Sequence, residues 1–189
     1  MSLWLASASP RRREILGSLG IAFQVHVTDI DESELPNEDP IGYVGRVARN
    51  KRSAAAEVLD GAILAADTTV TIDGRVLAKP QDDDDAREML RLLSGRIHHV
   101  HTGISIGHGG RFVDRVVSTE VVFATLSDSM IDRYVASGEP QGKAGAYAIQ
   151  GIAAGFVTDL RGSYSNVVGL PAREVVEGLL EVGALTSWP

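Results

Sequence analysis

Length, composition and charge exclude several classes of protein. The chain has 189 residues, 44% of them hydrophobic and 23% charged, which predicts one soluble domain over residues 1–189, divided at most into a larger and a smaller lobe. It contains no run of about 18 apolar residues and no basic, apolar leader, so neither a membrane span nor a secretion signal is expected. The absence of cysteine excludes a disulfide framework and agrees with a cytoplasmic location. The net charge of −7 argues against a nucleic-acid polymer as partner, whereas a small phosphorylated ligand needs only a local basic patch.

The first motif combines a strand, a loop of small residues and a helix that begins with basic residues. Residues 2–6 predict a strand, Ser9 is a good N-cap residue, and Pro10 fits the first helical position. Arg11–Arg13 follow in the first turn, where cations oppose the helix dipole, so replacing Arg12 should cost no stability. A solvated basic turn is the alternative. We interpret the motif as a phosphate site, because a strand, loop and helix N-terminus aim backbone N–H groups at an anion.

An acidic loop and a long helix come next. Residues 23–27 alternate as a strand and lead into 28–34, an acidic run that includes Glu32. Such a run is typical of a solvated loop, but a second carboxylate nearby would complete a magnesium-type site. Residues 40–59 predict a helix with Lys51 in the middle of its apolar stripe. Lys51 either extends past its neighbours to water or points into a site that holds negative charge.

The most unusual carboxylate belongs to Asp67. It directly follows an apolar run, residues 63–66, and the strand after it turns back at Asp73-Gly74, the strongest short hairpin signal. A carboxylate among apolar residues is costly unless it is paired or bound to metal. Asp67 is either a turn or capping residue between strands or an acid at a strand end that binds metal or activates water. Lys79, at the far end of the hairpin, favours the second interpretation.

Three further motifs look catalytic but have simpler explanations. Asp82–Asp85 resemble a metal motif, yet they precede an amphipathic helix and so should cap it. His99 and His101 share one face of a strand over residues 97–106, but they lack a nearby third ligand for zinc, and we expect them to face solvent. Gly103–Gly107 matches the G-x-S-x-G of serine hydrolases, but the following residues predict a hairpin turn where that motif needs a helix.

The last third of the chain alternates helices and strands. A helix capped by Ser127, a loop of small residues over 142–151, a strand over 156–160, a loop over 162–166 and a helix over 171–182 are expected. Together with the earlier elements they predict an α/β fold with a mixed sheet.

In order along the chain, these motifs resemble the Maf family of nucleoside triphosphate pyrophosphatases, once known as septum-formation inhibitors. The segments that carry the resemblance are Leu5–Arg12, Ala66–Thr68, Lys79–Pro80, Ser94–Gly95, His98, Val100, Thr102–Gly103, Lys143–Tyr147, Ile149–Gly151, Gly162–Tyr164 and Asn166–Pro171. One departure is Gly142, where the family pattern has an aspartate before the lysine.

The resemblance implies a mixed, strongly twisted sheet flanked by helices, similar to the inosine triphosphate pyrophosphatase (Maf/Ham1-like) fold, with a cleft between two lobes. It implies cleavage of a nucleoside triphosphate between the α- and β-phosphates, giving the monophosphate and pyrophosphate. Mg²⁺ or Mn²⁺ is the implied cofactor. A cytoplasmic homodimer with a link to cell division is also implied, and neither a membrane nor a nucleic-acid polymer is an expected partner.

Individual roles follow from the same resemblance. Asp67 matches the family's catalytic acid, a base for the attacking water and a metal ligand, and Glu32 matches the second carboxylate on the metal. Arg12, Lys51 and Lys79 match the basic positions that bind substrate. If Asp67 and Glu32 share a cavity, like charges should repel, so an Asp67→Asn variant should be at least as stable as the parent.

Three positions distinguish the branches of the family. Here they are Arg11, Thr68 and Gln150, which resemble the dTTP/UTP branch, with CTP or modified pyrimidine nucleotides as further substrates. The amide of Gln150 can both donate and accept across the O4/N3–H edge of uracil or thymine. Two other functions remain open from the sequence: a non-catalytic nucleotide-binding regulator of septum formation, and a serine hydrolase that uses Ser105.

Overall fold

The computed structural model describes residues 2–188 and divides them into two compact units. The first comprises residues 2–67, 102–117 and 169–188, and the second comprises 68–101 and 118–168. The strands are β1 (Leu3–Ala6), β2 (Gln24–Val25), β3 (Ala62–Ile72), β4 (Arg75–Leu77), β5 (Ile97–His108), β6 (Arg111–Phe123) and β7 (Val157–Arg161). The helices are α1 (Pro10–Ser18), α2 (Pro40–Ala56), α3 (Asp83–Leu93), α4 (Asp128–Ala136), α5 (Tyr164–Val168) and α6 (Ala172–Glu181), with two 3₁₀ turns, η1 (Ala144–Ala146) and η2 (Ile152–Phe156).

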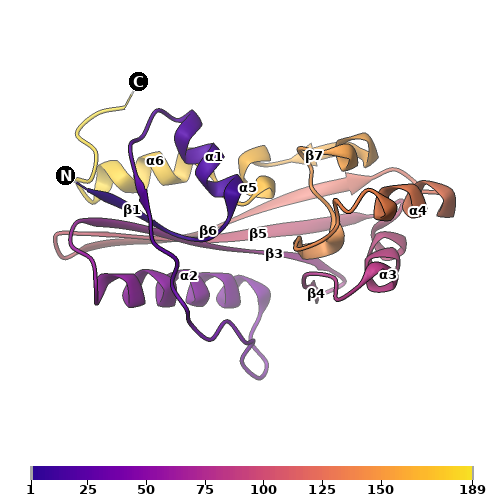
Figure 1. Ribbon diagram of the computed structural model, residues 1–189, viewed down its shortest axis with the longest axis horizontal. Helices are drawn as coiled ribbons and strands as arrows, with labels where there is room; N and C mark the ends of the chain where they lie inside the picture. Colours follow the sequence, from indigo (N-terminus) through magenta and orange to yellow (C-terminus); the bar gives the residue numbers. More distant parts are fainter. Residues whose placement is uncertain (1, 189) are drawn as a thin grey trace. The chain divides into compact units, whose positions relative to one another are not determined.

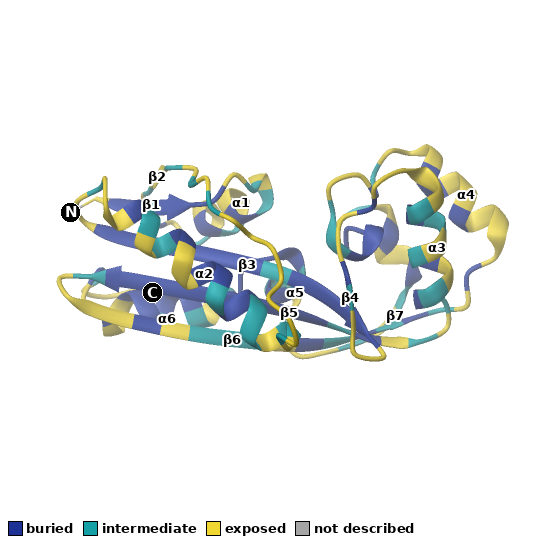
Figure 2. Ribbon diagram, turned by 90° about the horizontal axis from the view of Figure 1, so that it is seen from below, coloured by how far each residue is buried: buried dark blue, intermediate teal, exposed yellow. Residues whose placement is uncertain are grey.

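The expected α/β fold with a mixed sheet is confirmed. The strand order is β2-β1-β3-β5-β6-β7, with β4 added to β3. β1 pairs in parallel with β2 and β3, whereas β3 pairs antiparallel with β4, and β6 with β7. Within the first unit, α1 and α6 cover one face of the sheet and α2 covers the other (Figure 1). β3 is buried along almost its whole length (Figure 2), and its continuous apolar run, residues 62–66, is the part that the helices of the first unit cover on both faces.

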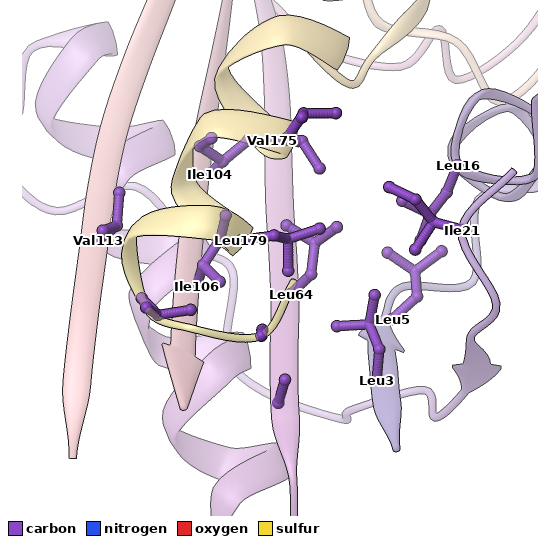
Figure 3. Close-up of a cluster of buried hydrophobic side chains, with 14 of the residues drawn as sticks. Leu3, Leu5, Leu16, Ile21, Leu64, Ile104, Ile106, Val113, Val175 and Leu179 are labelled. Carbon is purple, nitrogen blue, oxygen red and sulfur yellow. The ribbon is translucent and has the colours of Figure 1, made fainter. Parts of the chain in front are cut away.

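Alternating side chains of the strands build the core of the first unit. Figure 3 shows Leu64 of β3 meeting Leu179 of α6, and Leu16 and Ile21 gathered beside Leu5 of β1. On the opposite face, Ile63 and Ala65 of β3 pack with Ala55 of α2. The odd-numbered positions of β3 therefore face α2, and Asp67 continues that row.

The second unit contains the predicted hairpin. β3 turns into β4 through Asp73 and Gly74, whose φ angles of 51° and 74° are the positive pair that a type I′ turn requires. Asp82 caps α3 by accepting a hydrogen bond from the Asp85 backbone N–H, which confirms a capping role for the acidic run. Ser127 caps α4 in the same way through Met130.

Two expected elements differ in the structure. The strand expected at residues 23–27 is shorter: β2 has only two residues, both exposed, which pair with Trp4 and Leu5 of β1. The expected loop at residues 162–166 instead begins α5, where Ser163 Oγ accepts a hydrogen bond from the Asn166 backbone N–H. A serine three residues before that amide was a capping signal in the sequence.

Candidate active site

The loop after β1 is held by Ser7 and not by the expected cap. Ser9 occupies the N-cap position of α1 and Pro10 begins the helix, but the Ser9 side chain makes no capping hydrogen bond. The buried Ser7 side chain instead accepts from the Ser9 backbone N–H at 3.3 Å. Because Ser7 also binds the Arg12 guanidinium at 3.0 Å, it connects the strand end with the first turn of the helix. The sequence interpretation overlooked this residue, although it lies two positions before the cap.

Arg12 is a buried residue and not a solvated cation of the first turn. Its Nε donates to the Gly169 carbonyl at 2.8 Å, and its Nη1 donates to the Ala66 carbonyl at 2.8 Å as well as to Ser7. Burial lowers the pKa of Arg12, while the neighbouring Asp67 charge opposes that change. Arg12 therefore ties the loop after β1, strand β3 and the segment before α6 together, so the structure favours a loss of stability on its replacement, contrary to the expectation from the helix dipole.

Lys51 bridges the two carboxylates of the site. It lies in the buried stripe of α2, and its Nζ is 2.9 Å from Asp67 Oδ1 and 2.9 Å from Glu32 Oε2. Only 10% of the lysine side chain is exposed, so it does not extend to water. Of the two interpretations of Lys51, the structure supports the one in which it points into a site that holds negative charge.

Asp67 lies inside β3 and not at a strand end. The strand continues to Ile72, so pairing with Lys51 takes the place of solvent for this buried carboxylate. Asp67 and Glu32 do face the same place, as expected, but the ammonium between them offsets the repulsion of like charges. The expectation that Asp67→Asn preserves or raises stability therefore loses its physical basis.

Glu32 is positioned by hydrogen bonds between its loop and α2. The Tyr43 hydroxyl donates to the Glu32 carbonyl at 3.0 Å, and Arg46 of the next turn donates to the Ser33 carbonyl at 2.9 Å. The Glu32 side chain is 47% exposed, so this carboxylate can change partners more easily than Asp67. Burial raises the pKa of Tyr43 to about 12, with the charges of Asp67 and Glu32 as further causes. Tyr43 is a neutral donor at physiological pH and was not found from the sequence.

The remaining expected substrate residues occupy different surroundings. Arg11 is half-buried in α1, and burial lowers its pKa. Thr68, Lys79 and Gln150 all belong to the second unit, where Thr68 is half-buried and the other two are exposed. The first unit thus brings Arg12, Glu32, Lys51 and Asp67 together.

Gly142, the departure from the family pattern, has a local explanation. Its φ of 72° lies in the left-handed region that favours glycine. An aspartate at this position would adopt the same positive φ only at a higher conformational cost than glycine.

Two of the five histidines, His98 and His101, are buried. His101 is buried between the Thr71 hydroxyl, 3.1 Å from Nε2, and the Ser118 hydroxyl, 2.7 Å from Nδ1, contrary to the solvent-facing position expected. His99 stacks on it with ring centroids 5.9 Å apart and stays partly exposed. Among residues 2–188 no group of three His, Cys, Asp or Glu side chains could hold a metal ion.

His98 predicts a pH dependence of stability. It is completely buried, its Nε2 lies 2.8 Å from the Tyr147 hydroxyl, and burial lowers its pKa from 6.5 to about 4. Between those two pH values the unfolded chain binds a proton that the folded chain does not, so stability is full above the unfolded pKa and falls as pH drops through this window. The loss should reach about 3 kcal/mol.

Denaturant unfolding between pH 7.5 and 4 measures this effect. His98→Gln removes the titrating group, so the difference in unfolding free energy between parent and variant should shrink as the pH falls. Parallel curves for the two proteins would mean that His98 does not couple protonation to folding.

Ser105 is not a hydrolase nucleophile. It lies inside β5 with no exposed surface, and its hydroxyl accepts from Arg52 at 2.8 Å and donates to Asp114. The chain after it forms the predicted hairpin from β5 to β6 through Gly109 and Gly110, and no helix follows the serine. The serine-hydrolase alternative is therefore wrong, because a nucleophile elbow needs an exposed serine at a strand-to-helix turn.

The arrangement as a whole suits phosphoryl chemistry. A strand, loop and helix N-terminus, a buried arginine, and a lysine shared by two carboxylates combine anion-binding groups with a general base candidate. These features are typical of hydrolases that act on phosphate esters and anhydrides.

The sequence matches the family described as "Maf-like protein" over residues 2–182. The chain therefore belongs to the Maf family. It is 53% identical over 191 residues to the "dTTP/UTP pyrophosphatase" of Anaeromyxobacter dehalogenans strain 2CP-C, covering 98% of this chain and 96% of that protein. It is 48% identical over 186 residues to the protein of the same name from Escherichia coli O157:H7, covering 97% and 94%. A solved structure, the Staphylococcus aureus Ham1 protein, matches with a TM-score of 0.48 at 15% identity, over 66% of this chain and 72% of that one.

Proposed function

We propose that this chain is an enzyme that hydrolyses dTTP and UTP between the α- and β-phosphates, releasing pyrophosphate and the nucleoside monophosphate. The observation that carries the proposal is Lys51 held between Asp67 and Glu32, beside the buried Arg12 at the start of α1. Relatives that are about half identical over nearly the whole chain carry the name of that activity. The proposal extends to CTP or modified pyrimidine nucleotides as additional substrates.

Asp67 is the proposed general base. Its carboxylate accepts the proton of the water that attacks the phosphorus atom, and the ion pair with Lys51 fixes its orientation. Lys51 also keeps Glu32 near the same place. The positive charges of Arg12 and Lys51, together with the backbone N–H groups of the first turn of α1, stabilise the charge that develops on the phosphate oxygens. Lys79 is proposed as a further phosphate-binding residue.

Asp67 and Glu32 would hold a divalent cation, Mg²⁺ or Mn²⁺. Their carboxylate oxygens are the donors that such hard cations prefer, and within residues 2–188 they have no third metal-binding side chain with them. That donor set fits a cation shared with substrate phosphates and water, because Mg²⁺ is commonly bound by one or two carboxylates plus phosphate oxygens. A bound cation would supply charge neutralisation at the phosphates. Lys51 would then exchange some of its contact with the two carboxylates for contact with the substrate.

A pyrophosphate-release assay over natural and modified triphosphates, with and without Mg²⁺ or Mn²⁺, tests the proposal. We expect equal amounts of pyrophosphate and dTMP from dTTP, and the same for UTP, with much lower turnover of purine triphosphates. Nucleotide binding without any pyrophosphate would instead indicate a non-catalytic regulator of septum formation. Release of inorganic phosphate would place the cleavage at a different bond.

Gln150 is the proposed reader of the pyrimidine base, with Arg11 and Thr68 as the other specificity residues. A Gln150→Glu variant should lose about 10²-fold in kcat/KM for dTTP and UTP, because a carboxylate cannot donate to O4. Since Gln150 is exposed, the unfolding free energy should change by less than about 0.5 kcal/mol. Gln24→Glu, at an exposed position of β2, is the matched control. Unchanged dTTP and UTP rates in the Gln150 variant would remove Gln150 from base recognition.

The proposal also includes the cellular setting that the family resemblance implies: a cytoplasmic homodimer with a house-cleaning role in nucleotide metabolism and a link to septum formation. In residues 2–188, every helix is too short or too polar to cross a membrane. Sedimentation of the purified protein would test the dimer.

A further inference from the structure

Glu139 stands just beyond α4 and makes three hydrogen bonds. Its carboxylate accepts from the Tyr134 hydroxyl at 3.0 Å, from the Ile152 backbone N–H at 2.9 Å and from the Ala153 backbone N–H at 3.3 Å. The two backbone donors belong to the first turn of η2, where N–H groups lack partners within the helix. One side chain therefore connects the end of α4 to the start of η2.

Tyr134 extends this connection to the other side of Gln150. Its buried hydroxyl accepts from the Ala148 backbone N–H at 3.2 Å while it donates to Glu139. Burial raises the pKa of Tyr134, so its hydroxyl remains a neutral donor at physiological pH. Residues 148–153 are thus fixed at their beginning by Tyr134 and at their end by Glu139.

The backbone between these two anchors is a tight turn. The Gly151 N–H donates to the Ala148 carbonyl at 3.0 Å, which closes a four-residue turn with Gln150 exposed on it. A Cβ atom on Gly151 would collide with the Glu139 carboxylate, so the turn packs directly on that side chain. The preceding residue, Ile149, is buried, which leaves the Gln150 side chain as the polar group that the turn presents.

We propose that Glu139 is a positioning residue for base recognition. It holds the turn at residues 148–151 so that the Gln150 amide is presented to the pyrimidine in one orientation. This inference rests on the proposed function, because it assigns the purpose of the turn to the dTTP/UTP site. Glu139 itself does not touch the base: it acts through the backbone of Ile152 and Ala153 and through Tyr134.

The chemistry of the contact explains why a carboxylate is needed. All three partners of Glu139 are donors, and an ionised carboxylate is an acceptor only. A glutamine at this position would aim an amide NH₂ group at one of those donors, so at least one hydrogen bond would be lost without any change of side-chain length. The turn would then sample several orientations, and part of the binding energy of the base would be spent on ordering it.

Kinetics of Glu139→Gln test the inference. We expect the KM for dTTP and UTP to rise about tenfold with kcat changed less than about twofold, since the residues proposed for the chemical step are elsewhere in the chain. Tyr134→Phe removes both hydroxyl contacts while it keeps the ring that packs edge-on against Phe156, and it should shift KM in the same direction. Glu88→Gln, an exposed position of α3, is the matched control and should change neither constant.

The outcomes distinguish a positioning role of Glu139 in base recognition from a purely structural role. A merely structural role would lower the folded fraction and so lower kcat at unchanged KM, which would overturn the proposal, as would an unchanged KM in folded variants. If Glu139→Gln does not fold, the KM of Tyr134→Phe alone decides. A parent protein that releases no pyrophosphate from dTTP or UTP would refute the proposed function itself, and that result is distinct from an active parent whose KM is insensitive to both substitutions.

Discussion

An Asp67→Asn variant is expected to lose about 10³-fold in pyrophosphate release, because an amide cannot accept the proton of the attacking water. The replacement is nearly isosteric and lies inside β3, so the strand itself should persist. The amide would also bind a divalent cation more weakly, so added Mg²⁺ should raise the melting temperature of the parent more than that of the variant. Single-turnover measurements with dTTP at saturating enzyme would separate lost chemistry from lost binding.

The same variant should be less stable than the parent without metal. The buried Lys51 now pairs with both Asp67 and Glu32, and in the variant it would keep the Glu32 carboxylate but lose that of Asp67. This loss should lower the free energy of unfolding by about 1 to 3 kcal/mol. Asp73→Asn is the control: this aspartate pairs with Arg96 at the exposed hairpin turn, where the pair is worth less than about 1 kcal/mol and asparagine tolerates the positive φ. Asp67→Asn with reduced stability and normal turnover would make Asp67 a structural partner of Lys51.

Replacing Arg12 with Ala should have the largest effect on stability, about 3 to 5 kcal/mol. The substitution leaves the carbonyls of Ala66 and Gly169 and the hydroxyl of Ser7 without the guanidinium that now donates to them. Because these acceptors belong to three separate segments of the first unit, the loss should also loosen the loop after β1, which is the proposed phosphate-binding loop. Turnover at a temperature well below both melting points should fall about 10²-fold.

Neighbouring substitutions separate structure from chemistry at this position. Arg13→Ala removes an exposed arginine of the same helical turn and should change stability by less than about 0.5 kcal/mol. Arg12→Lys retains the charge but not the fork of donors, so it should restore little of the stability. If Arg12→Ala melts like the parent, the three hydrogen bonds contribute nothing measurable, and Arg12 would act on the substrate alone.

Local signals in the sequence determined most of the secondary structure. Asp73-Gly74 dictated the β3–β4 hairpin because few other pairs adopt two positive φ angles, and the acidic run at residues 82–85 dictated the start of α3 by capping. The family resemblance pointed to Arg12, Glu32, Lys51 and Asp67, together with Lys79 and the three specificity positions. The secondary-structure inferences depend only on neighbouring residues in the chain, whereas the site residues were inferred from the family pattern that the sequence matches.

Tertiary structure decided how those residues interact. Lys51 and Asp67 are 16 positions apart, Arg12 and Gly169 are 157 apart, and only packing of α2 and α1 on opposite faces of the sheet brings such pairs within hydrogen-bond distance. For that reason the sequence could not show that the Lys51 ammonium lies between the two carboxylates, or that Arg12 donates to the carbonyls of Ala66 and Gly169. Burial of His98 and His101 was equally hidden, because a strand pattern reveals which residues share a face but not what covers that face.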